Sequence, residues 1–145
     1  MKIIDAERDI LYPRLYSIGK RLTKSFNEQA EDLGVSALAS GLPFDNPTLM
    51  SLNFFNRPVP PDKLYLWQTG PSSFEEYDLK ASFVAGEQAT YANYLSITND
   101  GIFTYRGNFF VLCTKYTEED LQKTEEAFEK SLTTLKENSL IGLTK

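Results

Sequence analysis

A stripe of apolar residues near the N-terminus constrains the fold more than any other feature of the sequence. Beginning after Ile10, apolar side chains recur at spacings of three and four, at Leu15, Ile18, Leu22, Phe26, Ala30 and Leu33. This spacing collects them on one side of an α-helix, which we predict from about Leu11 to Leu33. Asp9 is its candidate cap, Pro13 falls in its first turn, and Gly34 suits the left-handed position after its last turn. A helix with one apolar stripe must cover a second layer, and a β-sheet is the expected partner.

Two pairs of strand-like segments supply that sheet. The first pair, Val35–Gly41 and Thr48–Phe55, is joined by the turn residues "PFDNP" and predicts a hairpin. The second pair, Ile102–Tyr105 and Asn108–Thr114, flanks Arg106-Gly107, a two-residue connection typical of a tight hairpin. Because the Asn108–Thr114 run is apolar on both faces, we expect it in the middle of the sheet.

The segment between the strand pairs begins with a proline-rich run. Three prolines in Asn56–Lys63 remove backbone donors and fix φ, which predicts a surface connection. "LYLWQTG" (Leu64–Gly70) is interpreted as an edge strand, and "SSFEEYDLKASF" (Ser72–Phe83) as a partial helix. We therefore treat residues 56–86 as a variable, loop-rich segment.

Two further helices are predicted after this segment. The first lies within "EQATYANYLSITNDG" and ends at the turn Asn99-Asp100-Gly101. The second opens with Thr117 as cap and Asp120 three residues later, a pair that resembles a capping box. Its apolar stripe consists of Leu121, Thr124, Phe128, Leu132 and Leu135.

The order of these elements predicts an α+β fold. Strand pairs joined by tight turns favour an antiparallel sheet, here of three or four strands, with about three helices packed on it in a second layer. The 145 residues suffice for one domain, so we expect residues 1–145 to form a single unit.

Composition excludes several classes of function. The net charge of −5 argues against nucleic acid as a partner, because phosphate binding needs a positive surface. No apolar run approaches the length of a membrane span, and the N-terminus lacks the pattern of a signal peptide. We therefore expect a soluble, cytoplasmic protein without a membrane partner.

The sequence contains no histidine, which removes the common routes to catalysis and metal binding by imidazole. Cys113, the single cysteine, is expected to be a buried thiol rather than a nucleophile. The acidic trio Glu118, Glu119 and Asp120 suits the first turn of a helix, where the dipole favours negative charge, better than a metal site. No catalytic, cofactor-binding or metal-ligating residue is assigned on this basis.

Arg106 is the one candidate binding residue. A guanidinium at the tip of a hairpin is well placed to hold a carboxylate through two parallel hydrogen bonds. A turn arginine is more often simply solvated, and both interpretations stay open at this point.

Two long segments carry a resemblance to a known family. "LYPRLYSIGKRLTKSFNEQAEDLGVSALASG" resembles the helix and strand that open the C-terminal small domain of class III (fold type I) pyridoxal-phosphate-dependent aminotransferases, especially the glutamate-1-semialdehyde aminomutase group. "NDGIFTYRGNFFVLCTKYTEEDLQKTEEAFEKSL" is similar to the end of that domain. The family commonly has histidine where this sequence has Tyr116, so a hydrogen bond from that position is not carried over.

The resemblance implies a part of an enzyme rather than a whole one. In the family, the lysine, aspartate and phosphate-binding residues that hold pyridoxal phosphate belong to a large domain that this chain lacks. The resemblance thus implies an inactive fragment whose partner is that large domain, with Arg106 as a candidate contact to the substrate carboxylate. Whether the chain itself is an enzyme is left open.

Two alternatives remain. A stand-alone α+β module would hold a partner chain or a second copy of itself through an exposed patch rich in Phe and Tyr. A small independent enzyme would need two carboxylates facing each other across a cleft.

Overall fold

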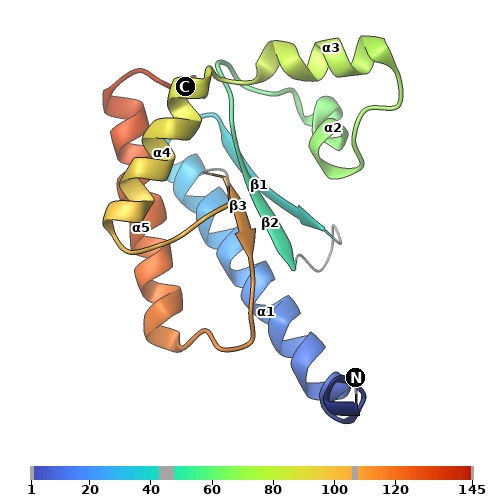
Figure 1. The fold of residues 1–145 in the computed structure, drawn as a ribbon. Coiled ribbons are helices and arrows are strands. Elements are labelled where there is room, and N and C mark those ends of the chain that lie inside the picture. Colours follow the sequence, from blue (N-terminus) through green and yellow to red (C-terminus); the bar gives the residue numbers. More distant parts are fainter. Residues whose placement is uncertain (1, 43–47, 106–107, 145) are drawn as a thin grey trace.

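The fold is a two-layer α+β sandwich of a small sheet and a helical layer (Figure 1). The computed structural model describes residues 2–42, 48–105 and 108–144. The elements follow in the order α1 (Lys2–Leu33), β1 (Ala37–Leu42), β2 (Leu49–Phe54), a short 3-10 turn (Pro61–Lys63), α2 (Tyr65–Gln68), α3 (Phe74–Phe83), α4 (Glu87–Asn99), β3 (Phe109–Val111) and α5 (Glu118–Glu137). The predicted fold class is therefore confirmed.

The described strands form an antiparallel sheet in the order β1-β2-β3. Ser51 in the middle of β2 pairs with Ser40 on one side and with Phe109 on the other. Because β3 occupies an edge, the prediction that Asn108–Thr114 forms a central strand is wrong. Val111 of that strand is 72% exposed, so apolar sequence on both faces did not lead to burial on both faces.

The main core lies between the sheet and the layer formed by α1, α4 and α5. Its centre is a chain of edge-to-face aromatic rings: Phe128 of α5 contacts Phe26 of α1 and Phe110 of β3, with centroid distances of 5.3 and 5.4 Å. Phe26 in turn contacts Phe54 of β2 at 6.3 Å. These rings join both layers, as the predicted helical stripes require.

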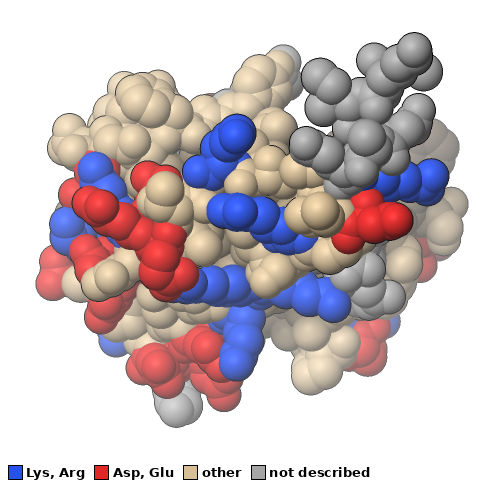
Figure 2. Space-filling view, turned by 90° about the horizontal axis from the view of Figure 1, so that it is seen from below, with Lys and Arg blue, Asp and Glu red and all other residues tan. Residues whose placement is uncertain are grey.

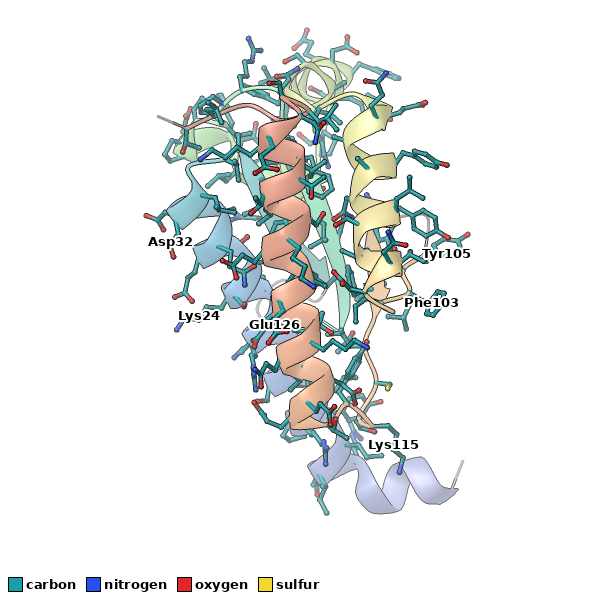
Figure 3. All side chains as sticks on the ribbon, turned by 90° about the vertical axis from the view of Figure 1, so that its left-hand side faces the viewer. Lys24, Asp32, Phe103, Tyr105, Lys115 and Glu126 are labelled. Atoms are coloured by element: carbon teal, nitrogen blue, oxygen red, sulfur yellow. The ribbon has the colours of Figure 1, made fainter. Side chains whose placement is uncertain are left out.

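Helix α1 is longer than predicted. It begins at Lys2 rather than near Leu11, so Pro13 lies inside the helix and not in its first turn. The N-terminal turns run beyond the sheet and bend away from the rest of the helix (Figures 1 and 3). Proline removes a backbone hydrogen bond and clashes with the preceding turn, which accounts for a bend here.

Helices α2 and α3 form a separate unit on the other side of the sheet from α1 (Figure 1). A second cluster of buried residues holds this unit: Phe55, Leu66, Trp67 and Phe83. Trp67 contacts Phe55 and Phe83 edge to face, with centroid distances of 4.8 and 6.2 Å. The edge strand expected at Leu64–Gly70 is wrong, since this stretch contains α2, whereas the helix expected at Ser72–Phe83 is confirmed as α3.

The C-terminal segment ties the two units together. Val35 and Leu143 form an isolated antiparallel bridge, and the Gly142 N–H donates to the Phe55 carbonyl at 2.7 Å. Gly142 also accepts from the Ser36 N–H at 2.7 Å. The chain end thereby crosses from the main core to the start of the α2–α3 unit.

Candidate functional site

The sheet has one face that the main helical layer does not cover. On β2, Met50, Leu52 and Phe54 are buried against that layer, so Leu49, Ser51 and Asn53 point to the opposite face. We call this opposite face the outer face. Its polar residues predict a surface open to water, a ligand or a partner rather than a second sealed core.

A hollow of about 340 Å³ lies between the outer face and the α2–α3 unit, and we call it the α2 pocket. Its lining residues are Ser40, Gly41, Leu49, Ser51, Asn53, Leu66, Trp67, Gln68, Thr69, Gly70, Lys80 and Phe109. The set combines hydroxyl and amide groups, an aromatic wall and a single charged side chain. No acidic residue is among these described lining residues.

The strand residues of the pocket are held in place by one amide. The Asn53 Nδ2 donates to the Leu38 carbonyl and to the Ser40 hydroxyl, both at 3.1 Å. These bonds cross from β2 to β1 at and beside the register pair Leu38–Asn53. The pocket therefore has a fixed polar floor made by neighbouring strands.

Lys80, in the last turn of α3, is the cation of the pocket. Its ammonium lies 5.5 Å from the centre of the buried Trp67 ring, within reach of a cation–π interaction. Partial burial lowers the pKa of Lys80, because desolvation disfavours the charged form. Within the described part of the chain, no carboxylate lies at ion-pair distance from it.

A second exposed feature lies on and beside β3, on the side of this strand away from β2. Phe103 is 80% exposed and Tyr105 is 62% exposed, and both project from the body of the molecule (Figure 3). The exposed Val111 lies on β3 itself, and Tyr105 is joined to that strand by a bridge with Phe109. We call Phe103, Tyr105 and Val111 the β3-edge patch.

Several charged residues outside the pocket form ion pairs with one another. Arg21 of α1 donates to both carboxylate oxygens of Glu125 at 2.8 Å and to Glu118 at 2.6 Å, contacts that raise the pKa of its guanidinium. The view from below shows a row of Lys and Arg side chains beside groups of Asp and Glu (Figure 2). This face thus carries both signs of charge.

The structure tests some of the site residues that the sequence predicted and leaves others untested. Arg106 lies outside the described residues, so its contact with a substrate carboxylate stays a prediction. The prediction that Cys113 is buried is wrong: the residue follows β3 and is exposed. Among the described residues, no three acidic or thiol side chains gather as a metal site would require, and no helix is long and apolar enough to cross a membrane.

Comparison with known proteins shows that this chain shares its fold with a solved structure. No protein-family model matches the chain, and no curated protein matches it in sequence. A solved structure, an omega-transaminase from Sphaerobacter thermophilus, matches with a TM-score of 0.56 and 18% identity, over 84% of this chain and 24% of the transaminase chain. The two share a fold. The chain spans about a quarter of the length of this transaminase. The match confirms the expected resemblance at the level of the fold.

The described lining of the α2 pocket does not fit pyridoxal phosphate. A site for this cofactor joins a lysine to a carboxylate that pairs with the pyridine nitrogen. The lysine of the α2 pocket, Lys80, has no such carboxylate among the described residues that line the pocket. No reaction step is therefore assigned to the cofactor on this chain.

The sequence patterns did not predict the α2 pocket or its lysine. The alternation of β2 does separate Ser51 and Asn53 from the core residues, and this signal could have marked the outer face. Nothing local distinguishes Lys80, because its place depends on Trp67 being folded into a helix that packs beside it.

Proposed function

We propose that the chain is the C-terminal small domain of a class III pyridoxal-phosphate-dependent aminotransferase, of the glutamate-1-semialdehyde aminomutase type, and that it acts with a separate large domain. The observation that carries this proposal is the fold shared over 84% of the chain with 24% of an omega-transaminase. The two sequence segments that resemble the ends of the family's small domain support the same assignment.

The surfaces of the chain suit such a role. The inner face of the sheet is closed by the chain's own helices, whereas the outer face is polar and only partly covered. The β3-edge patch adds exposed aromatic surface beside it. We infer that the large domain supplies the cofactor and its lysine, and that this chain covers the cleft from one side.

The test begins with the coding sequence that surrounds this chain. We expect it to encode, in the same frame or beside it, a large domain with a lysine suited to the cofactor. Co-expression of that domain with this chain should restore transaminase activity and the absorbance of an enzyme-bound aldimine, while each part alone should be inactive.

Two variants sharpen this experiment. Ser51→Arg places a bulky charge on the outer face and should abolish the restored activity without lowering the melting temperature. Glu126→Arg changes an exposed residue of α5 on the helical face (Figure 3) and serves as the matched control. If the chain alone, incubated with pyridoxal phosphate and borohydride, were labelled on one lysine, the assignment of the cofactor to another domain would be wrong.

A second candidate function is a stand-alone interaction module that binds through the β3-edge patch. The exposure of Phe103, Tyr105 and Val111 favours it, because apolar patches drive association. Self-association is compatible with both functions. Restored transaminase activity is expected only from the first.

A further inference from the structure

The α2 pocket has the composition of a small binding site in its own right. Its volume of about 340 Å³ lies at the lower end of the range found for ligand pockets. Such sites combine apolar walls with a few fixed polar groups that orient the ligand. Here Trp67, Leu66 and Phe109 supply the apolar walls, and Ser40 and Ser51 lie on the polar floor.

The polar groups of the floor favour an acceptor as ligand. The Ser40 oxygen accepts from the Asn53 amide at 3.1 Å, so the Ser40 hydroxyl proton remains available as a donor. The Ser51 hydroxyl lines the same hollow. A lysine ammonium carries donors and no acceptor. An oxygen-rich group bound here would therefore meet several donors at once.

The charge balance favours an anion. The chain as a whole carries a net charge of −5, yet the only charged residue among those described around the pocket is Lys80. Its ammonium has lost part of its hydration and lies against Trp67 rather than against any carboxylate that the structure describes. Charge-assisted hydrogen bonds to a bound carboxylate would offset the cost of that desolvation.

We propose that the α2 pocket binds a small organic carboxylate, with Lys80 pairing with the carboxylate and Trp67 contacting the apolar body of the ligand. The site is formed by this chain alone and is distinct from the cofactor chemistry of the proposed large domain. Titration of this chain alone therefore tests the site without the large domain.

The sequence contains a single tryptophan, and it is Trp67, so intrinsic fluorescence reports directly on the pocket. The experiment titrates the full chain with benzoate as the probe, and with benzamide as a neutral probe of similar shape. We expect a saturable change in Trp67 emission with benzoate and a much weaker response to benzamide. Inorganic phosphate should also bind more weakly than benzoate, because it offers charge without an apolar body.

Variants of Lys80 test the assigned contact. Lys80→Gln should weaken benzoate binding about tenfold or more, because the charge-assisted contact is lost. Lys80→Arg keeps the charge and should retain binding. The matched control is Lys130→Gln, which removes an exposed lysine paired with Asp100 at 3.0 Å and should leave binding unchanged.

A second measurement locates the probe without relying on a variant. Backbone amide chemical shifts of Ser40, Ser51 and Gly70 should move on benzoate addition, whereas those of α5 should not. Equal binding of benzamide, equal binding by Lys80→Gln, or shifts confined to other parts of the chain would each overturn the proposal.

Discussion

The two faces of strand β2 differ sharply although their residues alternate along one short segment. Met50, Leu52 and Phe54 are at most 4% exposed and lie in the main core. Leu49, Ser51 and Asn53 are only partly buried and face the α2–α3 unit. The inner face thus serves the stability of the domain, and the outer face is free to bind a ligand or a partner.

This difference has a physical origin in how each face is covered. The inner face meets two long helices, α1 and α5, that bring aromatic rings from distant parts of the sequence into contact. The outer face meets the one-turn helix α2 and the ten-residue α3, held by four buried side chains. Two helices as short as α2 and α3 leave part of the outer face accessible. The polar residues Ser51 and Asn53 lie in this accessible part.

The largest expected effect comes from substituting neighbours on the two faces. Leu52→Ala should lower the free energy of unfolding by about 2–5 kcal/mol, because it leaves a cavity in a packed core. Ser51→Ala should change it by less than about 0.5 kcal/mol, as is usual for partly exposed sites. Chemical denaturation measures both values, and similar losses for the two variants would contradict the proposed division between the faces.

A smaller effect is expected where the two units meet, at Gly142. A Cβ atom there would lie 2.6 Å from backbone atoms of Asn56 and Arg57, which cannot move aside as a side chain would. Gly142→Ala should therefore cost about 1–3 kcal/mol, the range for overpacking.

Gly86→Ala is the matched control for this variant. Apart from its neighbours in the chain, no described residue comes within 4 Å of a Cβ built at Gly86, and the backbone there lies outside the left-handed region. The cost there should stay below about 1 kcal/mol, the value of a cap preference at the start of α4. If Gly142→Ala were equally mild, the close packing of the C-terminal segment against Asn56 and Arg57 would not matter for stability.

Features with a local cause were predictable from the sequence. The capping box forms as expected, with Thr117 Oγ1 accepting from the Asp120 N–H at 3.1 Å and Asp120 accepting from the Thr117 N–H at 2.8 Å. Gly34 and Gly101 adopt the positive φ values that end their helices, at 66° and 82°. The first hairpin and the antiparallel sheet followed from alternation and turn residues.

Features decided by distant contacts were not predictable. The Leu64–Gly70 stretch has a strand-like sequence, but the packing of Trp67 against Phe55 and Phe83 stabilises a helical turn there. The position of β3 at an edge depends on which strand pairs with β2, which its apolar sequence does not specify. The α2 pocket was missed for the same reason, since it exists only once α2 and α3 are in place.

The smallest expected effect is a local response to acid in the α2–α3 unit. Glu76 of α3 accepts from the Ser72 N–H, the Ser72 hydroxyl and the Tyr65 hydroxyl, each at 2.7 Å. These bonds, led by that from the Ser72 backbone, lower the pKa of Glu76 from 4.5 to about 2. Because the folded pKa lies below the unfolded one, the stabilisation is fully present above about pH 4.5 and is lost as the pH falls through about 2.

Trp67 emission measured from neutral pH down to about pH 2 should follow this loss, because Tyr65 lies in the same one-turn helix as Trp67. Glu76→Gln removes the titrating group and should show altered emission at neutral pH with little further change on acidification. The far-UV circular dichroism of the long helices serves as the internal comparison, and should persist where the Trp67 signal of the native chain has already begun to shift. An identical acid transition in Glu76→Gln would mean that the change in Trp67 emission does not come from Glu76. The α2–α3 unit would then lose its structure together with the main core, and not independently of it.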